Sequence, residues 1–242
     1  MFDFRQTKPV VLAGAVRTPI GKFGGELRAL SAIELGVAAA TATLERAGIP
    51  ANAVDEAIFG HARQAGTGPN PARQVSIGAG IPESTPAFTV NQACASGLKS
   101  VMLAAQTVAL GGADVVLAGG IESMSNTPYL LPGARFGYRM GNAKLVDGMY
   151  RDGFMCPLCG DLMGATAERL AEKYQIGRRA QDDYAVETHR RAQAAREAGR
   201  FRDEVVPVEV PTRKGGSVVV TTDQHPRYNL TVEQMASLSP VF

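Results

Sequence analysis

Apolar residues recur at helical spacing directly after a short β-like run in the first half of the chain. Residues 87–90 read AFTV, and between 96 and 110 apolar side chains return every three or four positions until Gly111 and Gly112. This periodicity predicts an amphipathic helix, which two consecutive glycines end. The pattern therefore predicts a strand at 87–90 and a helix at 96–110, joined by a short elbow.

Other segments before residue 122 alternate between strand-like and helix-like patterns. Continuous apolar runs of strand length lie at 10–15, 57–60 and 115–118. Ser31 and Glu34 form a capping box, which predicts a helix that runs to Ala47 and ends at Gly48. Apolar strands without alternation, separated by helices, indicate an α/β fold in which helices cover both faces of the sheet.

The pattern changes after about residue 122. Residues 123–163 are rich in Met, Gly, Pro and Tyr, with little periodicity. Helical stretches follow at 166–174 and 180–198, and a hairpin is predicted from 205–210 and 218–221 around a Lys-Gly-Gly-Ser turn. A second capping box, Thr231 with Gln234, predicts a short final helix.

Cys94 lies on the predicted elbow between the strand 87–90 and the helix 96–110. The N–H groups at a helix start favour a thiolate and can stabilise an oxyanion when a thioester is attacked. Small neighbours, from Ala93 to Gly97, leave the sulfur accessible to a large substrate. The alternative is a small buried residue, which is common for an isolated cysteine.

The elbow segment 91–100, NQACASGLKS, resembles the nucleophile elbow of the thiolase family, which reads Asn-x-x-Cys-x-Ser-Gly at this point. Four further segments are similar to family signatures and occur in the family's order: 17–25, 70–74, 118–125 and 163–168. Segments 140–147 and 151–153 are most similar to the acetyl-CoA acetyltransferase members of the family.

The resemblance implies the first half of a thiolase-type layered αβα core with an inserted loop domain. Residues 1–122 correspond to the core without its last strand, and residues 123–242 to the loop domain that holds coenzyme A. The last residues, SLSPVF, match a family motif that lies well before the end of a complete thiolase. We therefore expect the C-terminal half to be absent, with the Gly-His-Pro histidine that activates the nucleophile and the Cys-x-Gly cysteine that shuttles the proton.

The resemblance also implies acyl transfer between acyl-CoA thioesters, either acetyl-CoA condensation to acetoacetyl-CoA or the reverse thiolysis. Cys94 would carry the acyl group, and coenzyme A would be bound by Phe154, Leu162, Met163 and Arg227. Biosynthetic members commonly have histidine at the position of Leu162, so acyl chain length and reaction direction stay open. Coenzyme A thioesters enter as substrates, and no metal or other cofactor is implied. The alternative is a catalytically incomplete acyl-CoA-binding fragment or subunit that needs a second chain.

Composition and charge indicate the general type of protein, its partners and its location, and they do not change this interpretation. The 242 residues are 45% hydrophobic and 20% charged, with a net charge of +2, as in ordinary soluble globular proteins. This small charge does not favour nucleic acid or membrane partners, and the start MFDFR lacks the features of a secretory signal. Three cysteines fit a reducing compartment, so we expect the cytoplasm. Intact thiolases are dimers or tetramers, which implies a homo-oligomer, with residues 70–74 at a subunit contact, or else a partner chain.

Two further features carry alternatives. Cys156 and Cys159 form a C-x-x-C pair, which could be a redox couple or half of a zinc site. Because no other ligands follow at zinc-finger spacing, we interpret them as incidental thiols. Among the histidines, His61 follows a predicted strand end and could approach the pocket, whereas His189 lies on a charged helix. The pattern G-x-G-x-x-G is absent, which argues against a dinucleotide fold.

Overall fold

The computed structural model describes residues 8–242; the start MFDFR, interpreted above, lies outside the described residues. At its centre is a three-stranded parallel sheet in the order β2–β1–β3. The strands are β1 (Glu56–Gly60), β2 (Ala87–Val90) and β3 (Val116–Gly120). In register, Ala57 lies opposite both Ala87 and Leu117, so β1 is flanked on both sides. The predicted strands at 57–60, 87–90 and 115–118 are thus confirmed to within two residues.

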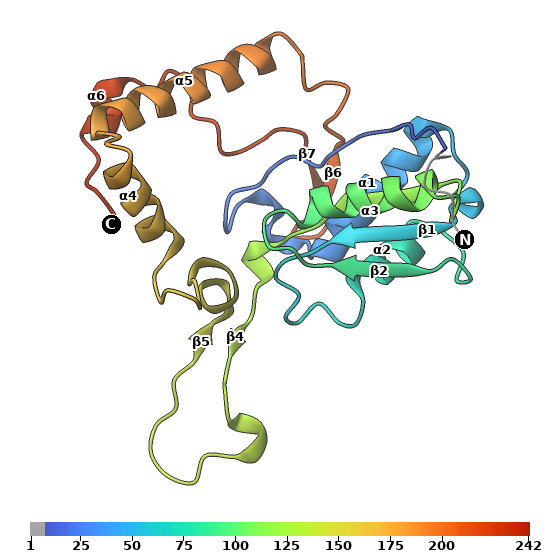
Figure 1. Cartoon of the computed structure of the whole chain (residues 1–242), viewed down its shortest axis with the longest axis horizontal. Coiled ribbons are helices and arrows are strands. Elements are labelled where there is room, and N and C mark those ends of the chain that lie inside the picture. Colours follow the sequence, from blue (N-terminus) through green and yellow to red (C-terminus); the bar gives the residue numbers. More distant parts are fainter. Residues whose placement is uncertain (1–7) are drawn as a thin grey trace.

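Helices cover both faces of this sheet. Helix α3 (Ser96–Ala109) packs on one face against β1 and β3, whereas α2 (Pro71–Gly78) lies on the other face beside α1 (Ala32–Ala47) (Figure 1). Ala57, Phe59 and Leu117 project toward α1 and α2 and form the main core with apolar residues of both helices. The layered α/β architecture predicted from the apolar strands is confirmed.

The capping box predicted for α1 is present. The backbone N–H of Glu34 donates to Oγ of Ser31 at 3.2 Å, and the Glu34 carboxylate accepts the backbone N–H of Ser31 at 2.7 Å. At the other end Gly48 adopts φ 66°, a left-handed conformation that glycine reaches at little cost. Local sequence signals therefore set both ends of this helix.

The apolar run 10–15 does not form a strand in the structure, contrary to the prediction. Val11 is 84% exposed and Leu12 80% exposed. A groove of about 620 Å³, lined mainly by apolar residues, lies between this segment and β3 with α3. The apolar pattern measures a tendency to be buried, but a strand also needs a neighbour within ladder distance. The groove separates the segment from the edge of β3, and no ladder hydrogen bond in the described part of the chain joins the two.

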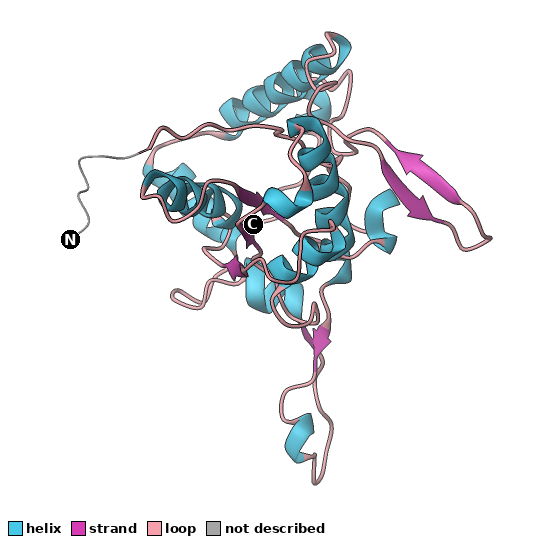
Figure 2. Ribbon diagram, turned by 90° about the vertical axis from the view of Figure 1, so that its right-hand side faces the viewer, coloured by secondary structure: helices cyan, strands magenta, loops and turns pink. Residues whose placement is uncertain are grey.

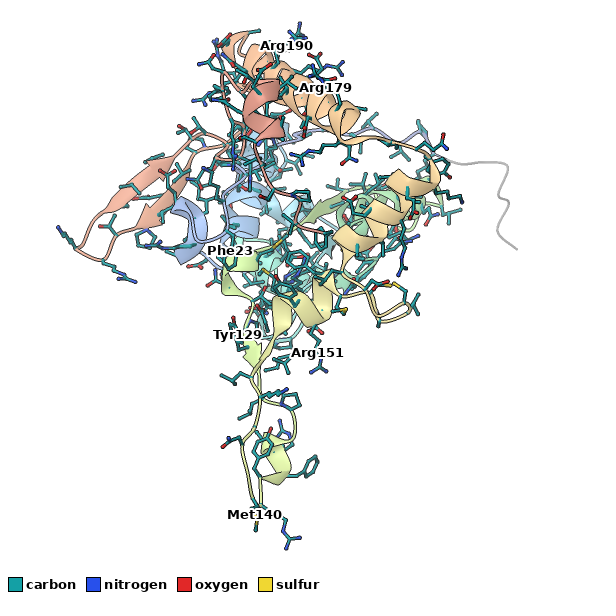
Figure 3. All side chains as sticks on the ribbon, turned by 90° about the vertical axis from the view of Figure 1, so that its left-hand side faces the viewer. Phe23, Tyr129, Met140, Arg151, Arg179 and Arg190 are labelled. Carbon is teal, nitrogen blue, oxygen red and sulfur yellow. The ribbon has the colours of Figure 1, made fainter. Side chains whose placement is uncertain are left out.

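Beyond β3 the chain leaves the sheet. After the 3-10 turn η3 (Met124–Asn126), strands β4 (Tyr129–Leu130) and β5 (Val146–Asp147) pair antiparallel and carry a long loop with the turn η4 (Ala134–Phe136). Met140, 96% exposed, lies at the tip of this loop, at the opposite end of the molecule from α5, which carries Arg179 and Arg190 (Figure 3). The π-helical turn η5 (Tyr150–Phe154) follows β5.

The remaining elements are helical apart from one hairpin. Helices α4 (Met163–Lys173), α5 (Arg178–Glu197) and α6 (Val232–Ala236) confirm the three predicted helices, and the Thr231–Gln234 capping box is present. Among the described residues, no helix combines the length and apolar character that crossing a membrane requires.

Strands β6 (Val208–Pro211) and β7 (Ser217–Val220) form the predicted hairpin, which projects from the body (Figure 2). Its buried side packs on the first part of the chain. Val208, Val210 and Val220 form a second core cluster with Leu27 and Leu30, in and beside the 3-10 turn η1 (Glu26–Ala29). Another 3-10 turn, η2 (Ala51–Ala53), precedes β1. The division of the chain near residue 122 stays a prediction.

Arg17 attaches this hairpin region to the body. Its guanidinium donates to both carboxylate oxygens of Asp223, at 2.7 and 2.9 Å, and to Glu204 at 2.7 Å. The pKa of Asp223 lies below its usual value because the Arg17 guanidinium hydrogen-bonds the ionised carboxylate. Backbone bonds from Arg17 to Glu204 and from Val206 to Arg17 run beside this ion pair. The segment 17–25, singled out in the sequence, thus forms hydrogen bonds with residues 187 to 203 positions away.

Candidate functional site

The candidate site lies where the three parallel strands end. Cys94 follows β2, His61 follows β1 and Glu122 follows β3. In a parallel sheet the carboxyl ends share one edge, so the three following loops lie next to one another. The backbone N–H of His61 donates to the carbonyl of Val90 at 3.0 Å, which ties the first two loops together.

Cys94 occupies a tight turn between β2 and α3, as predicted, and its side chain is exposed. Ala93 has φ 49°, a left-handed conformation that costs a non-glycine residue free energy. Two side chains hold this conformation. Asn91 Oδ1 accepts the N–H of Ala93 at 2.9 Å, and Ser96 Oγ accepts the N–H of Gln92 at 2.8 Å while donating to the Ala93 carbonyl at 2.6 Å. The elbow is therefore fixed by its own polar side chains.

The start of α3 lies just beyond Cys94. Ala95 at the N-cap carries no side-chain acceptor for the first helical N–H groups. The N–H of Ser96 already donates to the Ala93 carbonyl at 3.1 Å, so the groups that face an anion here are the following N–H groups of the first turn, together with the positive end of the helix dipole.

Glycines let α3 approach the strand ends closely. A Cβ on Gly60 would lie 2.2 Å from the carbonyl carbon of Ser96, and a Cβ on Gly120 would lie 3.0 Å from Cα of Gly97. Backbone therefore contacts backbone where β1 and β3 meet the first turn of α3. This contact sets how far the elbow projects beyond the sheet.

His61 is 1% exposed, and its Nε2 lies 3.1 Å from Oε1 of Glu122. The other oxygen of Glu122 accepts the backbone N–H groups of Ala62 and Arg63, each at 3.3 Å. Glu122 therefore organises the loop after β1. The sequence analysis quoted Glu122 within a motif but gave it no role; its position directly after a predicted strand was the available signal.

The loop after β1 connects Cys94 with Phe154. Asn91 Nδ2 donates to the Ala62 carbonyl at 3.0 Å, and the next residue, Arg63, places its guanidinium carbon 5.1 Å from the centre of the Phe154 ring. A cation over an aromatic face at this distance is attractive. Phe154 also packs edge-to-face on Tyr150, with ring centres 5.6 Å apart. The structure thus places Phe154 beside the strand ends.

Leu162 and Met163 lie at the start of α4. Leu162 is the N-cap and forms an isolated antiparallel bridge with Met155, the residue after Phe154. Met163, the first helical residue, is 47% exposed. These contacts bring Leu162 near Phe154, as the interpretation of both as coenzyme A contacts requires.

Arg227 contacts a different part of the molecule. Its backbone N–H donates to Nδ1 of His189 on α5 at 3.2 Å, and it lines a cavity of about 410 Å³ with Arg190, Gln193 and Leu230. Arg227 therefore lies against α5, whereas Phe154 contacts the loop after β1 at the strand ends. That one coenzyme A molecule contacts both Phe154 and Arg227 stays a prediction.

Comparison with known proteins agrees with this geometry. Residues 10–242 match the thiolase N-terminal domain family. The acetyl-CoA acetyltransferases of Cupriavidus necator and Pseudomonas aeruginosa are each 49% identical over 233 residues, which is 96% of this chain and 59% of theirs. A probable acetyl-CoA acetyltransferase of Escherichia coli is 47% identical over 235 residues. The chain thus spans about 59% of the length of the first two relatives.

Solved structures give the same result. The acetyl-CoA acetyltransferase of Bacillus anthracis superposes with a TM-score of 0.93 at 37% identity, over 98% of this chain and 60% of that one. The enzyme of that name from Syntrophomonas wolfei superposes with a TM-score of 0.91 at 41% identity, over 96% and 58%. The chain therefore belongs to the thiolase family, and its residues correspond to the N-terminal part of that fold.

Proposed function

We propose that this chain takes part in acyl transfer between acyl-CoA thioesters, with Cys94 as the residue that carries the acyl group. The observation that carries this proposal is the exposed Cys94 on a fixed elbow before α3. Relatives named acetyl-CoA acetyltransferase support the acyl-CoA substrate class.

The proposed reaction has two steps. The Cys94 thiolate attacks the thioester carbonyl of one acyl-CoA, and coenzyme A leaves as a thiol after taking up a proton. A second acyl-CoA, deprotonated next to its carbonyl, then attacks the acyl-cysteine and regenerates the thiolate. The covalent intermediate divides one difficult condensation into two easier steps. N–H groups at the start of α3 would stabilise the oxyanion in each.

Coenzyme A would act as substrate carrier. Phe154, Leu162 and Met163 are proposed to contact its pantetheine arm, since they surround one turn near the strand ends. Arg227 is proposed to bind the nucleotide phosphates, because an exposed guanidinium recognises phosphate oxygens well. Acyl chain length and reaction direction stay open.

Because the chain spans about 59% of its first relatives, activity of the whole protein is part of the proposal. The second candidate is an acyl-CoA-binding unit that needs a further polypeptide for turnover. It is favoured by one observation: the His61 side chain is 1% exposed, so its ring is shielded from a substrate at the exposed Cys94. We propose the cytoplasm as the location, because three cysteines fit a reducing compartment, and a homo-oligomer or a partner chain as the assembly, as the resemblance implies.

Acylation by a thioester tests the proposal directly. The chain is incubated with acetyl-CoA, and the acetyl adduct is located by intact mass and peptide mapping under conditions that preserve thioesters. We expect the adduct on Cys94, none with Cys94→Ser, and an unchanged yield with Cys156→Ser combined with Cys159→Ser. An adduct that forms on Cys156 or Cys159 ahead of Cys94 would overturn the assignment.

A further inference from the structure

The C-x-x-C pair lies on a turn that backbone bonds hold closed. Cys156 donates its N–H to the Asp161 carbonyl at 2.8 Å and accepts the N–H of Gly160 at its own carbonyl at 2.8 Å. The Met155–Leu162 bridge closes the base of the same turn. Cys156 and Cys159 therefore stand on one fixed four-residue bend, and their spacing matches the short disulfide loops of redox proteins.

The two cysteines lie three residues apart on this closed bend. The donor groups nearest the Cys156 sulfur are the backbone N–H groups of Cys159 and Leu158 and the thiol of Cys159. These donors lower the pKa of Cys156 below that of an ordinary thiol, against the opposing charge of Asp161. Arg169 pairs with Asp161 and offsets part of that charge. Cys156 therefore has more thiolate than an ordinary thiol at the same pH, and Cys159 lies three residues further along the bend.

Both cysteines can be reached from solvent. Cys159 is exposed and Cys156 partly so, and both are free thiols in this structure. A zinc site would need further ligands, and residues 8–242 contain no group of three or more His, Cys, Asp or Glu side chains placed to hold a metal ion. Two accessible thiols three residues apart on a closed bend fit thiol–disulfide exchange instead.

We propose that Cys156 and Cys159 form a reversible dithiol–disulfide site that reacts with small disulfides such as glutathione disulfide. The Cys156 thiolate attacks one sulfur of the small disulfide, forms a mixed disulfide and releases one thiolate. Cys159 then loses its proton and attacks the Cys156 sulfur, which closes the intramolecular disulfide and releases the second thiolate. The protein dithiol is oxidised by two electrons, and one disulfide is reduced to two thiols.

This site does not depend on the proposed acyl transfer, because Cys94 takes no part in it. The cysteine pair nevertheless lies within the segment that carries two of the proposed coenzyme A contacts. The bend lies between Phe154 and Leu162, so closing the disulfide would fix the geometry of the segment that carries both residues.

The experiment uses the full chain with Cys94→Ser, which leaves only the pair as thiols. The reduced protein is incubated with glutathione disulfide and quenched with acid, and adducts are measured by intact mass and peptide mapping. We expect loss of two hydrogens with both free thiols consumed, and full recovery on reduction. With Cys159→Ser added, the reaction should stop at a glutathione adduct on Cys156.

Rates separate the two sulfurs. With Cys156→Ser added instead, Cys159 should react about tenfold more slowly than Cys156 does in the matched Cys159→Ser protein, because nearby N–H donors lower the pKa of Cys156 and increase its thiolate fraction. Stable glutathione adducts on both cysteines, cross-linked dimers as the main product, or equal rates of the two single thiols would each overturn the proposal. Circular dichroism of each variant shows that it is folded.

Discussion

The α-carbon of Gly60 faces the carbonyl of Ser96 so closely that a Cβ there would lie 2.2 Å from the Ser96 carbonyl carbon. The end of β1 thereby meets the first turn of α3, two residues after Cys94. Gly60 on β1 also pairs with Val90 on β2 and with Gly120 on β3. Strand β1 therefore cannot shift away from α3 without breaking ladder hydrogen bonds. The position of the elbow therefore depends on Gly60 having no Cβ.

Substituting Gly60→Ala should therefore displace the start of α3. Overpacking of this kind costs about 1–3 kcal/mol, and we expect a loss of that size in the free energy of unfolding measured with urea. Gly177→Ala is the matched control, since a Cβ there meets nothing within 4 Å and its φ of −70° suits alanine. Equal stability of Gly60→Ala and the wild type would show that the close approach does not constrain the elbow.

Asn91 should control the reactivity of Cys94 by positioning the elbow. Asn91→Asp keeps an acceptor for the Ala93 N–H but loses the Nδ2 donor to the Ala62 carbonyl, whereas Asn91→Leu loses both. We expect acetylation of Cys94 by acetyl-CoA to slow by about tenfold in the leucine variant, with a smaller loss in Asn91→Asp. The rate with a small alkylating reagent should change less, because that reagent needs no oriented carbonyl. Identical acetylation rates in all three proteins would remove Asn91 from the positioning of Cys94.

The Arg17–Asp223 pair predicts a specific acid dependence of stability. Since its pKa is lowered in the folded protein, Asp223 contributes stability that is fully present above its unfolded pKa of about 3.9. That contribution is lost as the pH falls through the lower folded pKa. Asp223→Asn should lower the free energy of unfolding by roughly 1–2 kcal/mol at neutral pH, and by progressively less below about pH 4.

The control for this measurement is Asp183→Asn. Asp183 pairs with Arg179 on α5, but their side chains are 49% and 75% exposed, so the change should be small at every pH. If Asp223→Asn shows the same small change, Arg17 does not hold the hairpin region through this ion pair.

Exposed apolar residues near the N-terminal segment should make the 242-residue chain associate. Val11 and Leu12 are almost fully exposed beside the apolar groove along β3, and an open sheet edge with apolar side chains favours contact with another chain. We expect light scattering to show a mass above that of a monomer, reduced by Val11→Ser with Leu12→Ser. Leu158→Ser, on the exposed cysteine turn, should leave the mass unchanged. A monomeric wild type at low micromolar concentration would contradict this prediction.

The comparison of sequence with structure separates local from long-range information. Helix α1 was predicted to the residue because Ser31, Glu34 and Gly48 act on their immediate neighbours. Helix α4 begins at Met163, earlier than the predicted 166, because the Met155–Leu162 bridge sets its start and Leu162 is not a recognisable N-cap. The prediction of a strand at 10–15 was wrong for a similar reason, since strand pairing depends on an element far away in the sequence.

The residues of the candidate site also divide into those that local sequence predicts and those that depend on long-range contacts. Cys94 could be found from the sequence because the elbow is built from adjacent residues, including the Asn91 and Ser96 side chains that hold it. Glu122 could not be given a role, since its contacts with Ala62 and Arg63 cross about 60 positions and exist only through the parallel register of β1 and β3. The closed bend that carries Cys156 and Cys159 depends on backbone hydrogen bonds that the spacing of the two cysteines alone did not specify.

Complete turnover should need more than these 242 residues. Condensation and thiolysis require a base that forms the Cys94 thiolate and a group that moves the substrate proton, and each positioned group contributes about a hundred- to ten-thousand-fold. The resemblance to thiolases implies that both groups lie in the part of the family fold that this chain does not cover, whereas the His61 side chain is 1% exposed. We expect cleavage of acetoacetyl-CoA by free coenzyme A to be undetectable with the chain alone, although one acetylation of Cys94 persists. Adding a polypeptide that supplies the remaining part of the family fold should restore cleavage. Rapid cleavage by the chain alone would contradict this prediction, and His61→Ala would then show whether His61 is the base.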